Sequence, residues 1–355
     1  MDEGTTMINK KNVENNNSSL TEREPNKLTV YGCGGCGANI VREFFSLNTK
    51  DNSIFSDIIP VVLDASDSDF TTDIPDEYIY IVKDESGEQL EGGGKIRATN
   101  YDHIKESVRD MLVKFPPTDF NLVVHSNSGA SGSTIAPSIV NELMSKGHHV
   151  VVLMVGSVSS QLEILNNVRT IKSYENISTN ILNKPIISVY MENSEQTPKN
   201  KVDSSLRTLI GTIAIMASGK NKKLDKTDIS NFLDWTKVVN FKPCLTHLEI
   251  HGENIVIPEN ETLIGVLTLT DEDRSHETSV SKYYQAVGII PDNGLDNVKK
   301  DLPLHFCTII GHYNGIVERM NKLLAKFKTS EEATIRRGIL TDNDTKSTTE
   351  NGLIL

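Results

Sequence analysis

Short apolar runs alternate with helical patterns through the first half of the chain, and several of the runs end in glycine-rich loops. The runs include KLTVYGCGG, IIPVVLDAS, YIYIVKDE, NLVVHSNSG, HHVVVLMVGSV and KPIISVYMEN. Helical spacing marks the segments between them, such as HIKESVRDMLVKF and LEILNNVRTIKSYENI. Because near-continuous apolar strands joined by helices are typical of a parallel sheet covered on both faces, this half predicts a Rossmann-like α/β domain.

The second half predicts a smaller α+β domain. A helical stretch from about Asp203 to Ser218 joins the two halves, and the apolar segments CLTHLEIHGEN, TLIGVLTLTD, YYQAVGIIPD and LHFCTIIGHYNG follow it. The next segment, IVERMNKLLAKFK, predicts a long amphipathic C-terminal helix. Its apolar face carries Ile316, Met320, Leu323, Leu324 and Phe327.

We therefore divide the 355 residues into successive segments. These are a disordered N-terminal extension (1–26), the first α/β domain (27–202), a central linking helix (203–221), the second domain (222–312), a long C-terminal helix (313–337) and a tail (338–355). The tail is polar and can be interpreted simply as a disordered end.

Bulk composition narrows the function and the compartment. The net charge of −12 argues against direct nucleic-acid binding as the main activity. The N-terminal residues contain no signal-peptide core, and no run approaches the ~18 apolar residues of a membrane span. We therefore expect a soluble cytoplasmic protein without membrane contact.

The four cysteines fit a reducing compartment. Cys33 and Cys36 formally make a C-x-x-C motif, but no second C-x-x-C or C-x-x-H accompanies it in the sequence. We interpret the pair as small residues of a tight loop rather than as zinc ligands or a redox pair, and we predict no protein-built metal site.

Two loops predict contacts with phosphate groups. Residues 32–39, GCGGCGAN, lie between the first strand and a helix, where backbone N–H groups and the helix dipole favour an anion. Alone, this loop also fits a dinucleotide enzyme or a turn without a ligand. Residues 126–134, SNSGASGST, form a second such loop, which a Rossmann oxidoreductase normally lacks. It does not match the G-x-S-x-G nucleophile elbow.

A third loop, EGGGK at residues 91–95, follows the third predicted strand. It is not a Walker A motif, because Ile96 follows the lysine. Alone it could be a flexible surface loop, whereas its place at a strand end beside the other loops favours phosphate contact.

In this order, GCGGCGAN, LDAS, EGGGK and SGASGS resemble the tubulin/FtsZ superfamily, whose signature loop is G-G-G-T-G-[ST]-G. The altered loop SGASGS is closer to the phage-encoded tubulins of the PhuZ type. The segments VGSVSSQLEILNN, KKLDKTDISNFLDW and CLTHLEIHGEN also look like counterparts, so that the resemblance covers roughly residues 27–337. It implies the tubulin/FtsZ fold, with the first domain as the GTP-binding domain.

The resemblance also implies residue roles. Asp64 would lie near the nucleotide or its magnesium, Lys95 in the loop that senses the γ-phosphate, and Asp203 against guanine. The expected nucleotide contacts are Gly34, Gly35, Cys36, Asn39, Asp64, Gly93, Gly94, Lys95, Ser128, Gly129, Ala130, Ser131, Gly132, Ser133, Glu163, Asn166 and Asp203.

Two details qualify the base and ribose contacts. Glu163 and Asn166 resemble the E-P-Y-N acid and amide of tubulins, although Glu163 alone could be an ordinary exposed helix acid. The family often has an asparagine late in the strand VYMEN. We align that position with Val189, and Asn193 comes four residues later.

The catalytic residues implied by the resemblance are Asp225 and Asp228, in LDKTD at the start of the second domain. In tubulins and FtsZ the equivalent acids orient water on the GTP of the next subunit. Thr227 or Asp228 could simply be the N-cap of the following helix, and capping and catalysis are compatible.

We therefore expect an assembly-stimulated GTPase that binds GTP or GDP, with Mg²⁺ accompanying GTP, and forms head-to-tail filaments with itself. The resemblance implies that the filaments position phage DNA, a phage nucleus or capsids in the host bacterial cytoplasm. It also implies that the tail, with Asp342, Asp344 and Glu350, reaches the neighbouring subunit. The alternatives are a nucleotide-dependent switch that does not polymerise and, less favoured, a Rossmann oxidoreductase.

Overall fold

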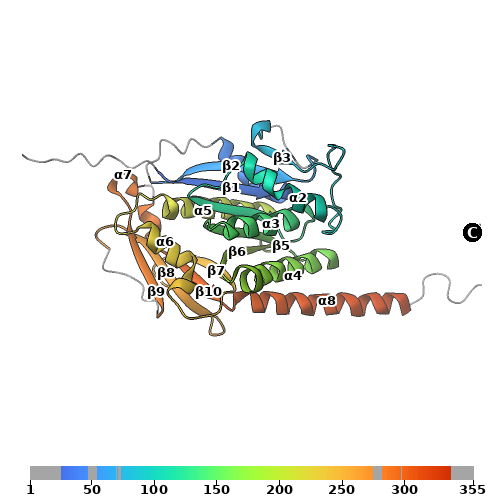
Figure 1. The fold of residues 1–355 in the computed structure, drawn as a ribbon. Helices are drawn as coiled ribbons and strands as arrows, with labels where there is room; N and C mark the ends of the chain where they lie inside the picture. The colour runs from blue at the N-terminus through green and yellow to red at the C-terminus, as the bar shows by residue number, and fades with distance from the viewer. Residues whose placement is uncertain are drawn as a thin grey trace, which may run out of the picture.

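The computed structural model describes residues 25–46, 54–68, 70, 73–274, 282–296 and 298–336, and the side chains of these residues except 293 and 330–336. Nearly all of the expected N-terminal extension and the whole expected tail lie outside these ranges. Figure 1 shows the arrangement of the described elements.

One ten-stranded mixed sheet runs through the described chain, in the order β3-β2-β1-β4-β5-β6-β7-β10-β8-β9. Its strands are β1 Lys27–Cys33, β2 Asp57–Asp64, β3 Ile79–Ile81, β4 Phe120–Ser126, β5 Val150–Ser157, β6 Ile186–Asn193, β7 Leu245–His251, β8 Thr262–Thr270, β9 Tyr284–Ile289 and β10 Leu304–Ile310. The pairs from β3 to β7 are parallel, β10 is antiparallel to β7 and β8, and β9 is parallel to β8. The predicted α/β fold with a parallel first half is therefore confirmed.

Helices cover both faces of the sheet. They are α1 Gly34–Val41, α2 Tyr101–Lys114, α3 Ser131–Ser145, α4 Gln161–Asn176, α5 Lys199–Ala217, α6 Lys226–Leu233, α7 Asp292–Leu295 and α8 His312–Arg336. Successive strand residues point to opposite faces, so each buried strand supplies two apolar clusters. One cluster joins the strands to α1, α5 and α6, and the other joins them to α2, α3, α4 and α8.

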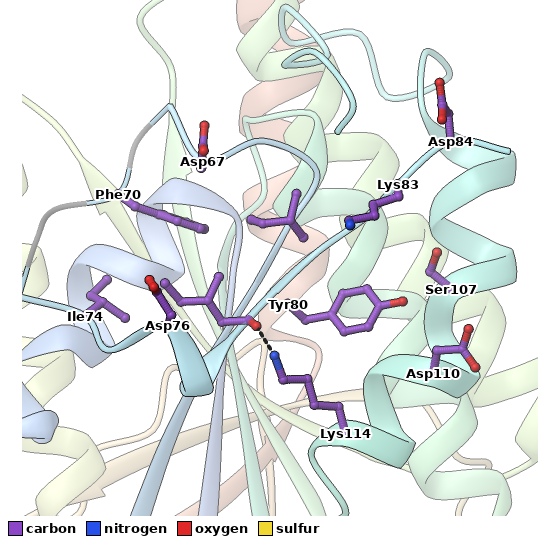
Figure 2. Close-up of a pocket in the computed structure, with 12 residues that line it drawn as sticks. Asp67, Phe70, Ile74, Asp76, Tyr80, Lys83, Asp84, Ser107, Asp110 and Lys114 are labelled. Carbon is purple, nitrogen blue, oxygen red and sulfur yellow. Dashed lines mark hydrogen bonds between the residues drawn. The ribbon is translucent and has the colours of Figure 1, made fainter. Parts of the chain in front are cut away.

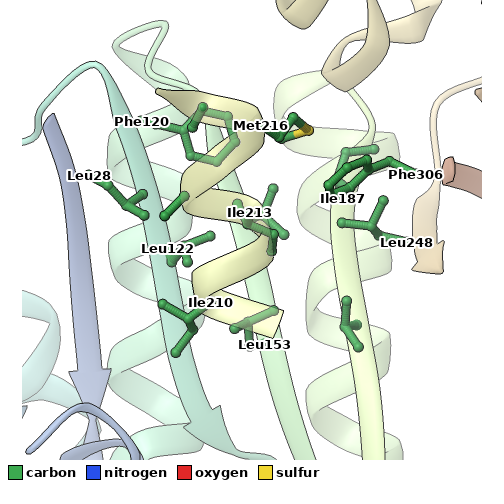
Figure 3. Close-up of a cluster of buried hydrophobic side chains, with 14 of the residues drawn as sticks. Leu28, Phe120, Leu122, Leu153, Ile187, Ile210, Ile213, Met216, Leu248 and Phe306 are labelled. Atoms are coloured by element: carbon green, nitrogen blue, oxygen red, sulfur yellow. The ribbon is translucent and has the colours of Figure 1, made fainter. Parts of the chain in front are cut away.

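The linking helix α5 packs in the middle of the first cluster. Figure 3 shows Ile210 and Ile213 of α5 close to Leu122 and Leu153 of the strands, and all four side chains are fully buried. The helix begins at Lys199, four residues before the predicted start, because Pro198 provides a turn from which a helix can begin. It ends at Ala217, just before Gly219 with its φ of +69°.

The two ends of α5 lie at opposite edges of the sheet. At the last turn, the carbonyl oxygen of Ala214 accepts a hydrogen bond from the backbone N–H of Ser56, and that of Ser218 accepts one from Asn26. Asn26 and Ser56 immediately precede β1 and β2, so this end of α5 lies at the amino ends of the strands. Because α5 has 19 residues, its first turn lies roughly 28 Å away, at the carboxyl ends.

The division into separate domains at residues 202 and 221 stays a prediction. The strands on either side of this boundary pair directly, because β6 and β7 run parallel from Ile186 opposite Leu245 to Ser188 opposite His247.

Candidate functional site

The carboxyl ends of β1, β2, β4, β5 and β6 surround a hollow of about 320 Å³. This is the edge at which open α/β sheets bind ligands. The predicted residues that line it are Gly34, Gly35, Cys36, Asp64, Lys95, Ser128, Gly129, Ala130, Ser131, Gly132 and Glu163. The structure therefore brings together residues of all three predicted loops and of the LDAS turn.

The first two loops pack directly on each other through glycines. A Cβ added to Gly34, which has a φ of +72°, would lie 2.8 Å from the backbone nitrogen of Gly132. A Cβ added to Gly132 would lie 2.5 Å from the carbonyl oxygen of Cys33. Side chains at either position would push the loops apart, so the glycines are needed for the width of the hollow.

Two helices begin at this hollow. The N-cap residues are Cys33 for α1 and Ala130 for α3, and neither side chain makes a capping hydrogen bond. First-turn N–H groups therefore remain available to a ligand, and the positive ends of two helix dipoles lie beside them. This arrangement favours an anion with several oxygen acceptors, such as a polyphosphate.

The third loop is held to α4 by polar contacts. The ammonium group of Lys95 lies 2.5 Å from Glu163 Oε1, and Ser157 Oγ donates to Glu163 Oε2 at 2.8 Å. Burial would raise the pKa of Glu163, but the bonds from Lys95 and Ser157 outweigh it and hold the pKa below its usual value. Glu163 is therefore a mostly buried, ion-paired carboxylate at the rim, and not a free surface acid.

Other predicted residues support the loops from behind. Asn166 Nδ2 donates to the carbonyl oxygens of Lys95, at 2.8 Å, and Ser128, at 3.1 Å, and so joins the third loop to the second. A Cβ on Gly93 would lie 2.7 Å from the Cβ of Ala130, which places Gly93 in the contact between these loops. Gly92 lines the hollow. The predicted residues that do not line it are Asn39, Gly93, Gly94, Ser133, Asn166 and Asp203.

Two predicted residues that do not line the hollow contact each other near the start of α5, where Lys199 does line it. Asn39 Nδ2 donates to Asp203 Oδ2 at 2.8 Å. Burial raises the pKa of Asp203, although the nearby Lys199 and Arg207 and the Asn39 bond act in the opposite direction. Asp203 Oδ1 and Asn193 Oδ1 are buried and accept no hydrogen bond from the described residues. Two acceptors of this kind suit the N–H donors of a guanine edge.

The alignment of Val189 with the family asparagine is not supported by its position. Val189 is 5% exposed and lies in the apolar cluster around α5, whereas Asn193, at the end of β6, lines the hollow. Sequence reasoning also did not assign Ser66, Ser68, Ser157 and Lys199, which lie outside the predicted loops and line the hollow as well. Most of them lie at or just after a strand end, a position that the pattern of apolar runs could have indicated.

Asp225 and Asp228 lie far from this hollow, beyond the other end of α5. Asp225 accepts hydrogen bonds from the backbone N–H groups of Thr227, at 2.7 Å, and Asp228, at 2.9 Å, and caps α6. Asp228 accepts in turn from the N–H of Asp225 at 3.1 Å. The N-cap of α6 is therefore Asp225, and not Thr227 or Asp228 as predicted, while Asp228 completes a reciprocal capping box. One subunit does not bring these acids to its own hollow.

A larger hollow, about 990 Å³, lies at the outer edge of the sheet between β3 and α2 (Figure 2). Lys114 closes part of its floor by donating to the carbonyl oxygen of Ile79 at 2.6 Å. Its lining mixes apolar residues with side chains of both charges and includes none of the glycine loops. Size alone therefore does not identify the functional site.

Comparison with known proteins indicates what the chain is similar to. No family model matches it. A phage tubulin-like protein of Pseudomonas phage PhiPA3 is 28% identical over 337 residues, which cover 93% of this chain and 99% of that protein. Among solved structures, a TubZ protofilament from bacteriophage PhiKZ superposes with a TM-score of 0.75 at 25% identity, covering 89% of this chain and 96% of that one. The GDP form of the phage tubulin PhuZ gives 0.76 at 21% identity, with the same coverage.

Proposed function

Because the chain belongs to the tubulin/FtsZ superfamily, as a protein of the phage tubulin-like type, we propose that it is a polymerising GTPase. It binds GTP or GDP in the hollow at the carboxyl ends of the strands and hydrolyses GTP where two subunits meet. The observation that carries this proposal is the separation of the site into two parts at opposite ends of α5.

The nucleotide fits the hollow in one orientation. Its phosphates would face the N-termini of α1 and α3, where the glycine loops leave room and N–H donors. Its base would face α5, where Asp203 Oδ1 and Asn193 Oδ1 are acceptors without donors. An adenine edge presents an acceptor at N1, so this pair favours guanine.

Magnesium would enter with GTP. Among the described residues there is no group of three or more His, Cys, Asp or Glu side chains placed to hold a metal ion. Mg²⁺ usually takes one or two carboxylates together with phosphate oxygens and water, and Asp64 at the rim could supply a carboxylate. The ion would offset the negative charge of the phosphates.

Head-to-tail assembly would complete the site. Stacking the α6 end of one subunit on the nucleotide end of the next would place Asp225 and Asp228 over the neighbour's phosphates. Hydrogen bonds from the N–H groups of Asp228 and Thr227 lower the pKa of Asp225, so it is ionised at neutral pH and can orient a water molecule. Such a heterologous contact yields a filament when the rotation between subunits does not close into a ring.

We further propose that the filaments position viral DNA, a phage nucleus or capsids in the cytoplasm of an infected bacterium. Kinship with phage tubulin-like proteins supports this role, and relatives have been solved as a protofilament and as a filament. No described helix is long and apolar enough to cross a membrane. The second candidate function is a nucleotide-dependent switch that does not polymerise. It would use the same nucleotide site but would have no catalytic interface between subunits.

Mixing two inactive variants tests the shared site. Gly129→Glu should block the nucleotide, because Gly129 lines the hollow and an added Cβ meets no atom within 4 Å, so the new carboxylate can project into it. Asp228→Ala should bind GTP but not hydrolyse it. In a mixture, the intact hollow of one variant meets the intact Asp228 of the other, and phosphate release should return.

The control is the double variant Gly129→Glu/Asp228→Ala, which cannot restore either single variant. Wild-type specific activity should rise with protein concentration, and Asp228→Ala filaments should disassemble slowly after GTP addition, as light scattering would show. Activity per subunit that is independent of concentration, together with no restoration on mixing, would reject the shared site and favour the switch.

A further inference from the structure

A forked ion pair joins the C-terminal helix to the last residues of β6. Arg319 of α8 donates from Nη1 to Glu192 Oε1 at 3.0 Å and from Nη2 to Glu192 Oε2 at 2.7 Å. The planar guanidinium group thus contacts both oxygens, a geometry that fixes direction as well as distance. Glu192 is only 17% exposed in its side chain, although Arg319 is about half exposed.

The same carboxylate fixes an aromatic ring over β5. Tyr190 Oη donates to Glu192 Oε2 at 2.9 Å. The ring lies across the backbone of Gly156, since a Cβ added there would lie 1.9 Å from Tyr190 Oη. A clamp therefore holds the ends of β5 and β6 together on the face that α8 covers, and it consists of Arg319, Glu192 and Tyr190.

The clamped residues adjoin the nucleotide hollow. In the parallel register Gly156 lies opposite Glu192, and Ser157 lies opposite Asn193. Asn193 carries one of the two buried acceptors proposed for the base. Ser157 donates to Glu163, which holds Lys95. The clamped residues are thus the direct chain neighbours of groups at both ends of the site.

We propose that Arg319 is a positioning residue for nucleotide binding, which couples the orientation of α8 to the rim of the hollow through Glu192 and Tyr190. The proposal rests on the proposed nucleotide site. Helix α8 runs along α4 and past its end (Figure 1), and α4 carries Glu163. Since coupling is reciprocal, any contact that shifts α8 alters nucleotide affinity, and a bound nucleotide restricts α8.

The neighbouring pair on the same helix provides a matched control. Lys322 Nζ lies 2.7 Å from Glu318 Oε1 across one turn, and both side chains are about two-thirds exposed. Lys322→Met removes the same charge from α8 as Arg319→Met does, but it breaks no contact with the sheet. If Arg319 acted through surface charge alone, the two variants would have the same nucleotide affinity.

The test is the affinity of a fluorescent GDP analogue, measured by titration at protein concentrations below assembly. We expect Arg319→Met and Glu192→Gln each to weaken binding of the analogue about 5- to 30-fold. The double variant should bind it as tightly as the weaker-binding of the two single variants. Arg319→Lys should have an intermediate affinity, because an ammonium group cannot contact both carboxylate oxygens in the forked geometry. Melting temperatures should stay near wild type, since a half-exposed pair contributes little to stability.

Three results would each overturn the proposal. They are wild-type GDP affinity in Arg319→Met, a loss of affinity in Lys322→Met as large as that in Arg319→Met, and additive losses of affinity in the double variant. A wild-type protein that binds no guanine nucleotide would instead overturn the proposed function, and the inference with it. The outcomes are distinguishable because the first set requires a wild-type protein that binds GDP.

Discussion

Replacing Gly156 with alanine tests the clamp from its other side. The added methyl carbon would lie 1.9 Å from Tyr190 Oη, 2.4 Å from Cζ and 2.7 Å from Cε2. Carbon and oxygen atoms that are not bonded normally stay more than 3 Å apart, so the ring must move by about 1 Å or more. Such a shift strains or breaks the 2.9 Å bond to Glu192 and displaces Ser157.

The expected size follows from similar overpacking. Forcing one methyl group into a packed site costs about 1–3 kcal/mol. For a chain of 355 residues that lowers the melting temperature by a few degrees at most, at about 1–2 °C per kcal/mol. Binding of GDP should also weaken, by about tenfold if Ser157 and Asn193 lose their positions. Thermal unfolding with and without GDP, together with titration of the fluorescent analogue, measures both effects.

A second substitution distinguishes the steric cause from a general loss of structure. Tyr190→Leu removes all three of the atoms that clash, so Gly156→Ala/Tyr190→Leu should be more stable than the sum of the single effects predicts, by about 1–2 kcal/mol. Gly315→Ala serves as a control. Gly315 lies in α8 with no atom near its added Cβ, and alanine there should be neutral or stabilising. If Gly156→Ala is as stable as wild type, or if the double variant is simply additive, the clamp does not exist as described.

Three further predictions concern the two ends of the site and the core. Gly129→Glu should weaken GDP binding by about 100-fold or more through volume and charge, while the melting temperature without nucleotide stays near wild type. Tyr284→Phe should lower GTP turnover in filaments and leave GDP binding unchanged, because Tyr284 Oη donates to the carbonyl oxygen of Asp228 at 3.2 Å and holds the acid in place; unchanged turnover would contradict this role. Burial lowers the pKa of His125 to about 3, so the folded chain keeps this ring neutral while the unfolded chain takes up a proton below pH 6.5. Stability should therefore fall as the pH drops from about 6.5 towards 3, by about 2 kcal/mol at pH 5 from this group, and His125→Gln should reduce that slope in urea titrations.

The alternation of apolar runs and helices was enough to predict the parallel part of the sheet, because its central strands β1, β4 and β5 are buried on both faces along nearly their whole length. It did not predict that β7 continues the same sheet. That pairing joins Ile186 to Leu245, far apart in the sequence, and no local pattern encodes which strand lies next to which. The second half therefore looked like a separate unit, although its strands extend one continuous hydrogen-bonded sheet.

The candidate site also has a part that the sequence predicts and a part that it does not. Loops in which glycine is required by close backbone contact, such as Gly34 against Gly132, are evident from sequence because few other residues can replace it. Contacts made by ordinary polar residues are not. The family asparagine was aligned with Val189, and Asn193 was given no role. A position at the end of a parallel strand is the better guide to a ligand site than an aligned offset. The bond between Arg319 and Glu192 spans 127 residues and has no motif at all.

Two rigid connections thus begin at the nucleotide hollow and lead to different surfaces. Helix α5 starts with Lys199 at the rim and ends near the acids that would act on a neighbour, whereas the Glu192–Arg319 bond leads to α8 and the chain terminus. Because the two connections share no side chain, the proposals built on them can fail separately. Arg319→Met should change GDP affinity while filaments at saturating GTP keep their turnover, and Asp228→Ala should abolish turnover while GDP affinity stays unchanged. If both variants altered both properties equally, hydrolysis and nucleotide affinity would depend on a single global state of the subunit, and the separate connections would have no functional meaning.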